Sequence, residues 1–145
     1  MTRHYTIHLP VGLELLNANQ RLHRAVRSRL TASIRAAAMR ACSEDDTMRA
    51  ALVSAGDAPL LQRAYILGVL QPASRRRADP ANWYPSFKAA VDGLVDAGVL
   101  EDDDHTRLVG PDMRIGPVVR GARLSLFIQE ITAAEHAAFQ WRNAS

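Results

Sequence analysis

Residues 75–92 read RRRADPANWYPSFKAAVD, and residues 101–104, a short distance further on, read EDDD. The first stretch joins a run of cations to a helix with an apolar stripe, and the second places acids just past the end of that helix. Lys88 is the most unusual residue, because the other seventeen Lys plus Arg cations of the chain are all arginines. A lysine ammonium is a compact point charge whose pKa can shift on burial. Chance composition is one explanation of Lys88, and a specific chemical role is the other.

The composition is that of an ordinary globular protein. The 145 residues are 48% hydrophobic and 23% charged, and we expect a single domain over residues 1–145. The one cysteine, Cys42, excludes an intramolecular disulfide framework and suits a reducing cytosol. The first residues lack the apolar run of a signal peptide, and no window approaches the roughly 18 apolar residues of a membrane span. We therefore expect a cytoplasmic protein with no membrane partner.

Hydrophobic periodicity and turn residues divide the chain into eight elements. Ser43, followed by three acids, predicts a helix N-cap, and Gly98 predicts the end of a later helix. Pro85 is expected to keep Tyr84 out of the helical region. The predicted elements are strands over residues 5–9, 63–70, 108–115 (interrupted near Gly110-Pro111) and 123–129, and helices over residues 22–41, 43–55, 85–97 and 133–142, the last capped by Thr132.

The order of these elements predicts the fold class. Strand, helix, helix, strand, helix, strand, strand, helix is typical of an α+β domain with a small mixed β-sheet and helices packed on it. The strand over 63–70 is mostly apolar and is predicted to be central. On the helix over 85–97, Lys88 and Asp92 lie together at the edge of the apolar stripe, so both are expected to be partly buried. The core stripes are Leu22, Val26, Leu30, Ile34 and Ala38 on the first helix, and Phe87, Val91, Leu94 and Val95 on this one.

Acidic residues stand on both sides of the Lys88 helix. Asp79 follows the predicted central strand, where a carboxylate on a rigid support can be catalytic; alternatively it is an N-cap, because Asp before Pro is a good one. Asp102, Asp103 and Asp104 repel one another, and a bound cation would relieve the repulsion. Hard carboxylate oxygens favour Mg²⁺, Mn²⁺ or Ca²⁺. The alternative for the acid run is a solvated loop.

Lys88 lies between Asp79 and the acid run. The helix is roughly 18 Å long, so the two groups can meet only if the chain returns along the helix. A lysine beside metal-bound carboxylates can stabilise charge on a phosphate or position an attacking water. The structural alternative is an i,i+4 pair with Asp92, although the lysine-first order is the weaker orientation for helix support.

Arginines cluster next to Asp79 and on the first helix. Arg75, Arg76 and Arg77 could bind phosphates beside carboxylates that bind metal, which is what phosphodiester cleavage in DNA needs. The arginine-rich face near residues 21–35 is either a solubility face or a second track for DNA phosphates. Zinc-ligand spacing, a Gly-rich phosphate loop and a serine nucleophile elbow are all absent from the sequence. No small-molecule cofactor is therefore expected.

The residues resemble those of a known family. The block Arg77-x-Asp79-x-x-Asn82, then Lys88-Ala89-Ala90-x-Asp92-x-Leu94, Ala97-Gly98 and Asp102-Asp103 is similar to the RusA family of Holliday junction resolvases. The resemblance extends from the opening strand to the final strand, and residues 43–56 are its least familiar part. It implies a single RusA-like domain that acts as a homodimeric, Mg²⁺-dependent endonuclease. Such enzymes cut four-way DNA junctions with paired nicks in recombination and repair, and are associated with phages and prophages.

The same resemblance assigns roles to residues. Asp79, Lys88 and Asp103 are the expected catalytic residues, and Asp79, Asp102 and Asp103 are the expected ligands of Mg²⁺, with Mn²⁺ as a possible substitute. The expected partners are branched DNA and a second copy of the chain. The protein is expected to be cytoplasmic and to be encoded by a bacterium or by a phage. The residues expected to contact DNA are Arg75, Arg76, Arg77, Arg21, Arg24, Arg27, Asn17, Asn19 and Asn82.

One departure from the family pattern bears on catalysis. The family has a second aspartate where this chain has Ala81, and about three extra residues separate Asn82 from Lys88. Either the gap hides a shifted ligand, or another acid such as Asp104 substitutes, or the metal site is weakened. The alternatives to the nuclease are a relative that binds junctions without cutting them and a small dimer with no nucleic-acid role.

Overall fold

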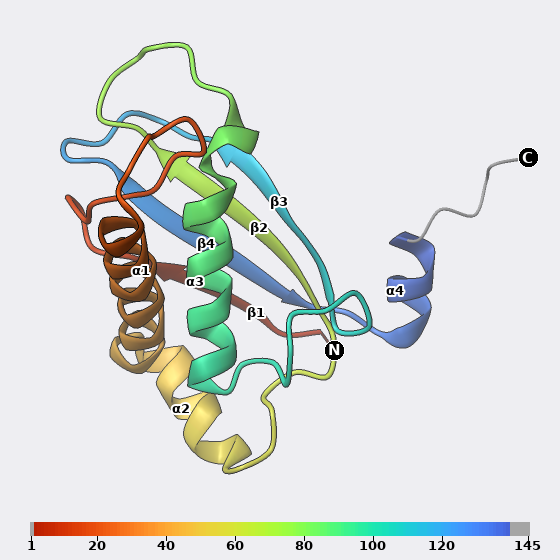
Figure 1. The fold of residues 1–145 in the computed structure, drawn as a ribbon. Coiled ribbons are helices and arrows are strands. Elements are labelled where there is room, and N and C mark those ends of the chain that lie inside the picture. The colour runs from red at the N-terminus through yellow and green to blue at the C-terminus, as the bar shows by residue number, and fades with distance from the viewer. Residues whose placement is uncertain (1, 140–145) are drawn as a thin grey trace, which may run out of the picture.

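A computed structural model describes residues 2–139 of the chain and contains one four-stranded sheet (Figure 1). The fold is of the predicted α+β class, with a mixed sheet and helices packed on it. The elements are β1 (His4–His8), α1 (Arg24–Glu44), α2 (Asp46–Ala55), β2 (Ala64–Gln71), the short 3-10 helix η1 (Pro80–Trp83), α3 (Tyr84–Ala97), β3 (Leu108–Ile115), β4 (Arg123–Glu130) and α4 (Ala133–Phe139).

The sheet has the strand order β1-β4-β2-β3. β4 runs antiparallel to both β1 and β2, whereas β2 and β3 are parallel. A parallel pair needs a crossover connection, and here η1 and α3 supply it. β2 is central, as predicted. β3 is continuous through Gly110-Pro111 rather than interrupted, and its pairing with β2 changes register there, between Tyr65 and Leu67.

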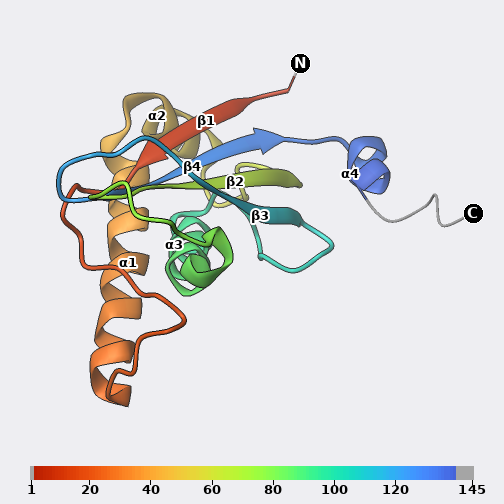
Figure 2. The same cartoon turned by 90° about the horizontal axis from the view of Figure 1, so that it is seen from above.

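Helix α3 lies on one face of the sheet, with α1 packed beside it (Figure 2). A Cβ placed on Gly68 of β2 would lie 2.4 Å from the Phe87 ring of α3. A Cβ placed on Gly93 of α3 would lie 2.3 Å from the carbonyl oxygen of Arg35 on α1. Glycine at these two positions lets α3 approach both neighbours closely, and this packing fixes where the side chains of α3 point.

The boundary between the first two helices differs from the prediction. Ser43 does not cap α2; it lies in the last turn of α1, and the cap is Asp45, whose carboxylate accepts a hydrogen bond from the Met48 amide at 2.9 Å. The apolar stripe of α1 continues through the buried residues Ala41 and Cys42. Burial therefore carries α1 past the point where a capping residue alone suggested a break.

The start of α3 also differs from the prediction. Tyr84 is helical, with φ −50° and ψ −42°, because η1 runs directly into α3. Pro85 lies in the first turn, where its missing N–H has no intrahelical partner to lose. The steric bias against a helical residue before proline is outweighed here by the continuous path from η1. Gly98 ends α3 in the left-handed region, at φ 92°, as expected.

The last helix is capped as predicted. Thr132 Oγ1 accepts from the Glu135 amide, and Glu135 Oε1 accepts from the Thr132 amide, both at 3.0 Å. Phe139 of α4 stacks on Tyr65 of β2, with ring centroids 5.5 Å apart. Residues 140–142 of the predicted helix lie outside the described residues. Within residues 2–139, no helix has both the length and the apolar character needed to cross a membrane.

The Gly93 contact gives a test of the packing. Gly93→Ala should destabilise the fold by about 1–3 kcal/mol, because the new methyl group overpacks the backbone of α1. Helix propensity alone predicts the opposite sign, a gain of roughly 0.8–1 kcal/mol. Urea unfolding of the two proteins separates the two effects by sign. A more stable alanine variant would show that α1 and α3 do not approach as described.

Candidate functional site

Lys88 connects two acids that are far apart in the sequence. Its Nζ donates a hydrogen bond to Asp92 Oδ1 at 2.6 Å and another to Asp103 Oδ2 at 2.5 Å. The side chains of Lys88, Asp92 and Asp103 are 42%, 25% and 21% exposed. The prediction of partial burial for Lys88 and Asp92 is therefore confirmed. The predicted i,i+4 pair of Lys88 with Asp92 is present, and Lys88 forms a second ion pair with Asp103.

The chain after α3 turns back so that Asp103 reaches Lys88. The segment following Gly98 is anchored by Leu60 and Leu61, whose amides donate to Gly98 and Val99 at 2.9 Å. Asp104 then fixes the next turn by accepting from the amide and hydroxyl of Thr106. The acid run is thus an exposed loop, as the structural alternative predicted, but Asp103 within it is partly buried and lies against the helix.

The charges of this cluster stabilise one another. Burial alone would lower the pKa of Lys88, but its hydrogen bonds to Asp103 and Asp92, with the charges of both acids, together raise that pKa. The hydrogen bond from Lys88 is the largest cause of a lowered pKa at Asp103, against the opposing effect of desolvation. Lys88 is therefore protonated, and Asp103 ionised, at neutral pH.

Arg35 of α1 stands beside the same cluster. It forms a bidentate pair with Asp96 of α3, at 2.5 and 2.8 Å. The hydrogen bond and charge of Asp96 raise the pKa of Arg35, and the charges of Asp92 and Asp103 contribute in the same direction. One face of the molecule thus gathers two cations and three carboxylates from α1, α3 and the acid run.

Asp79 and Asp102 take other positions. Asp79 Oδ1 accepts a hydrogen bond from the Ala81 amide at 3.0 Å, so Asp79 is the N-cap of η1. Asp102 Oδ1 accepts from the Asp103 amide at 2.7 Å. Neither shares a hydrogen bond or ion pair with Lys88 among residues 2–139. The structural alternative for Asp79 is therefore realised, and this does not prevent its free oxygen from binding a ligand.

The carboxylates fit a magnesium ion in part. Within the described chain, no three His, Cys, Asp or Glu side chains gather into a ready metal centre. Magnesium, however, is usually held by only one or two carboxylates and keeps water or substrate phosphates as its other ligands. Asp92 and Asp103 both contact the Lys88 ammonium, so they are the pair of carboxylates that one cation already holds together. The sequence marks Asp92 as the i,i+4 partner of Lys88 and as part of the RusA-like block, but Asp92 was not predicted as a metal ligand.

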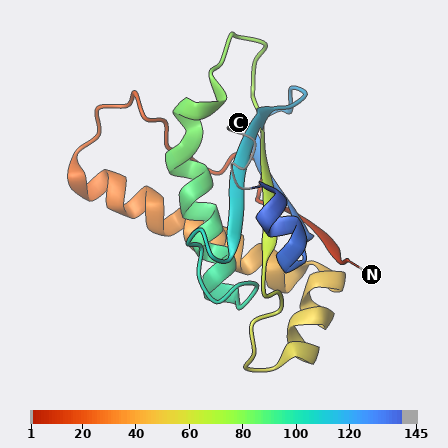
Figure 3. The same ribbon diagram turned by 90° about the vertical axis from the view of Figure 1, so that its right-hand side faces the viewer.

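The predicted DNA-contacting arginines lie on exposed segments. Residues 72–79 form a loop at one end of the molecule, and residues 9–23 form a second loop at the same end (Figures 1 and 3). Arg75, Arg76 and Arg77 are exposed and make no hydrogen bond or ion pair with any residue in 2–139. Of the arginines at the start of α1, Arg27 donates to the Gln20 carbonyl at 3.1 Å, while Arg21 and Arg24 are exposed.

The predicted asparagines lie where these two loops meet the start of α3. The Ala18 amide donates to the Asn82 carbonyl at 2.7 Å. Asn17 Oδ1 accepts from the Asn19 amide at 2.8 Å and shapes the turn. The buried Ser86 hydroxyl donates to the Leu16 carbonyl and accepts from its amide, both at 2.7 Å. Asn17, Asn19 and Asn82 are thereby brought together, although the contacts seen for Asn17 and Asn82 serve the loop itself.

No protein-family model matches this sequence, and no curated protein matches it either. The site is therefore interpreted from its own geometry and from the residue pattern.

The Lys88 cluster predicts a pH-dependent contribution to stability. Lys88→Met should lower the free energy of unfolding, by at most about 1 kcal/mol because Lys88 is 42% exposed and screened by solvent. Asp103 has a folded pKa below the usual 3.8, so its stabilisation is present above that pH and is lost as the pH falls through the folded pKa. Lys88 has a folded pKa above the usual 10.5, so its stabilisation is fully present below pH 10.5 and is lost as the pH rises through the folded pKa.

Urea unfolding at neutral pH and at about pH 3 measures this difference. The difference in free energy of unfolding between wild type and Lys88→Met should be smaller at the acid pH. Arg49→Met is a matched control, because Arg49 pairs with Asp46 on the exposed surface of α2. A gap that stays constant across the whole range would show that Lys88 contributes packing rather than charge.

Proposed function

We propose that this chain is a magnesium-dependent, structure-selective DNA endonuclease that resolves Holliday junctions by paired phosphodiester cleavage. The supporting observation is Lys88 on α3, whose Nζ contacts the carboxylates of Asp92 and Asp103. An exposed run of arginines precedes η1 and α3 in the chain. Carboxylates for a divalent cation thus lie on α3 and in the acid run, and the arginines for phosphates are without hydrogen-bond or ion-pair partners among residues 2–139. The resemblance to RusA resolvases supplies the substrate class.

The residues divide the chemical work. Asp103 and Asp92 would hold Mg²⁺, with Asp79 and Asp102 as the further ligands that the resemblance nominates. When bound, Mg²⁺ supplies stabilisation of charge on the phosphate and lowers the pKa of a water molecule. Lys88 is protonated, so it serves as a fixed positive charge beside the scissile phosphate and not as a general base. It also orients Asp103 before substrate arrives.

Asp92 offers a replacement for the acid that is missing at position 81. It lies on the same lysine as Asp103, whereas Asp104, the other candidate in the acid run, is occupied by Thr106. A lysine between two carboxylates lowers their repulsion in the free protein. Entry of Mg²⁺ would then require the Lys88 ammonium to move toward the substrate phosphate, which is where its charge is needed.

The Arg75–Arg77 loop supplies sequence-independent affinity. Three exposed guanidinium groups without protein partners can neutralise DNA phosphates and release counterions. Arg21 and Arg24 extend the positive surface on the neighbouring loop and helix start. Affinity for branched DNA is therefore expected to fall steeply as salt is added. Such a nuclease would act in the cytoplasm, encoded by a bacterium or by a phage.

Lys88→Arg tests the catalytic role of the lysine. The broad guanidinium should not replace a point charge between two carboxylates, so the rate of nicking a synthetic four-way junction in Mg²⁺ should fall tenfold or more, about 1.4 kcal/mol of barrier. Junction binding in Ca²⁺ should change little, because the arginine loop is intact. Arg49→Lys on α2 is the control and should cut at the wild-type rate. An arginine variant with full activity would return Lys88 to a structural role.

A second candidate function is binding of junctions without cleavage. Ala81 at the position of the family's second acid favours it, as does the capping role of Asp79. This candidate predicts tight junction binding with little dependence on metal and no nicks in either Mg²⁺ or Mn²⁺. Turnover that is abolished by Asp103→Asn would exclude it. Failure to bind any branched DNA at low salt would exclude both candidates.

Paired cleavage implies a homodimer, since one copy offers one acid cluster and a junction needs two sites related by a two-fold axis. The sheet face away from α1 and α3 carries apolar side chains that could meet a second copy. Leu67 and Phe127 are direct cross-strand neighbours there, and Phe127 is 40% exposed. Together with Tyr65 they border a shallow hollow of about 310 Å³.

Sedimentation velocity tests this assembly. The wild-type chain should sediment as a dimer at micromolar concentration, and Phe127→Lys should shift it toward the monomer by placing a charge in the apolar face. Val53→Lys, at a 76% exposed position on α2, is the matched control and should leave the dimer intact. A wild-type monomer would count against paired nicking by this chain.

A further inference from the structure

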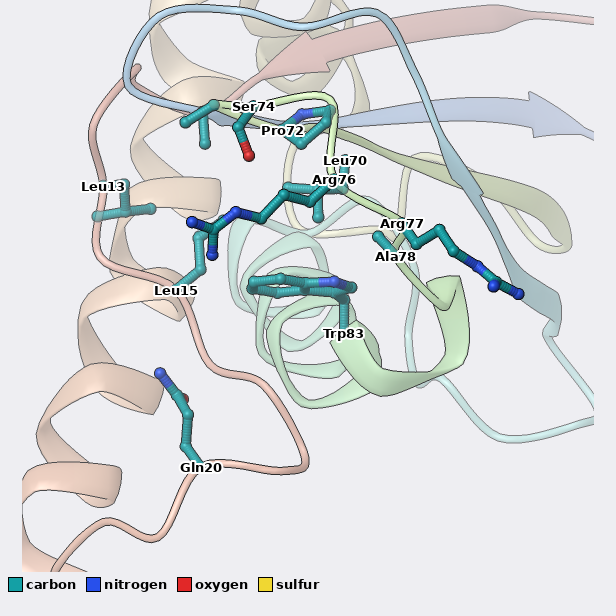
Figure 4. Close-up of a pocket in the computed structure, with 12 residues that line it drawn as sticks. Leu13, Leu15, Gln20, Leu70, Pro72, Ser74, Arg76, Arg77, Ala78 and Trp83 are labelled. Carbon is teal, nitrogen blue, oxygen red and sulfur yellow. The ribbon is translucent and has the colours of Figure 1, made fainter.

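A pocket opens between the two loops that flank the start of α3 (Figure 4). Its volume is about 400 Å³, at the small end of the range of ligand sites. Leu13 and Leu15 come from the loop before α1, Leu70 and Pro72 from the end of β2 and the loop after it, and Trp83 from η1. The pocket is therefore apolar inside, and it belongs to the same end of the molecule as the arginine loop.

Trp83 gives the pocket a flat aromatic wall. It is partly buried and packs against the core on one side. In Figure 4 the face of its indole ring is turned to the pocket, with Leu15 beside it and Arg76 passing above it. Flat apolar walls around an indole are suited to stacking of a planar ring.

The rim of the pocket is polar and positively charged. Arg76 and Arg77 both line it, and neither has a protein partner among residues 2–139. Gln20 also lines it and turns its amide nitrogen toward the opening (Figure 4), while its oxygen is held by the Asn17 amide at 2.8 Å. The pocket thus joins a stacking surface to an amide donor and to the Arg76 guanidinium, while the Arg77 guanidinium points away from the pocket on the outer side of the loop (Figure 4).

We propose that this pocket receives one unpaired nucleobase of a DNA strand, stacked on Trp83, with the flanking phosphates on Arg76 and Arg77. The inference rests on the proposed function for its source of DNA, and it adds that the protein reads unpaired character directly. The planar base matches the Trp83 wall, and the phosphates on its two sides match the arginines of the rim. Arg76 breaks no hydrogen bond or ion pair with residues 2–139 when it moves aside for the base.

Other occupants fit less well. An aliphatic ligand would leave the two arginines and the Gln20 amide without partners, and a phosphate alone would leave the indole wall unused. A free nucleotide carries the same chemistry as a strand, but it offers phosphate on one side of the base only. The strand is therefore the occupant that uses both arginines, and the free nucleotide is one arm of the test.

Fluorescence of Trp83 provides the experiment. Trp141→Phe removes the only other tryptophan, so that emission reports Trp83 alone. The probes are a twelve-residue oligo-dT and the same length of tetrahydrofuran abasic strand, which carries the same phosphates without bases. We expect oligo-dT to quench Trp83 and to bind at least about fivefold more tightly than the abasic strand. Trp83→Leu, which keeps apolar bulk, should remove this preference, and Trp83→Phe should retain most of it.

The outcomes are separate from those of the cleavage assay. Equal binding of the two strands, or binding of neither, would overturn the pocket inference while junction cleavage stands. Quenching by dTMP with the affinity of oligo-dT would overturn it in favour of a free-nucleotide site. Because the comparison of strands uses a protein with an unaltered pocket, it holds even if a Trp83 variant folds poorly. Failure to bind any DNA, branched or single-stranded, would overturn the pocket inference and the proposed function together.

Discussion

The close packing of α3 between the sheet and α1 is the constraint on which the rest of the structure depends. Glycine at position 68 admits the Phe87 ring to the surface of β2, and glycine at position 93 admits the backbone of α1. With both sides fixed at such short range, α3 can neither slide nor rotate without a clash. The edge of α3 that carries Lys88 therefore faces the segment in which the chain returns with Asp103.

The choice of lysine within this frame has a physical reason. Two carboxylates on one side of a helix repel each other, and a small ammonium can contact both at once. A guanidinium would match one carboxylate in a planar, bidentate fashion, as Arg35 does with Asp96 on the same face. The structure thus contains both kinds of cation within one cluster, each in the geometry that suits it. A chain whose other Lys plus Arg cations are all arginines keeps its one lysine where Asp92 and Asp103 converge.

Much of the fold could be predicted from the sequence because local patterns agreed with the final packing. The stripe on α3, the apolar run in β2 and the capping box at Thr132 all led to elements that the structure contains. The errors came where tertiary burial or the preceding element overrode a local signal. At Ser43 the buried face of α1 continued past a good capping residue, and at Tyr84 the preceding η1 overcame the usual effect of proline.

The candidate site was predictable only in part. Sequence pattern singled out Lys88 and Asp103, yet it could not show that they touch, since that depends on a return of the chain after Gly98. It gave Asp79 and Asp102 as ligands, and the structure shows what each does in the free protein without testing that role. The Trp83 pocket left no sequence signal, because its lining comes from four segments that meet only in the folded chain.

Ser86 has a mechanical consequence. Its buried hydroxyl holds both the amide and the carbonyl of Leu16, so the loop before α1 is tied to the first turn of α3. A force applied to that loop is transmitted to the helix unless two buried hydrogen bonds break together, which is costly in an apolar surrounding. Lys88 lies two residues beyond this latch. A displacement of this loop must therefore either break these hydrogen bonds or move the helix turn that precedes Lys88.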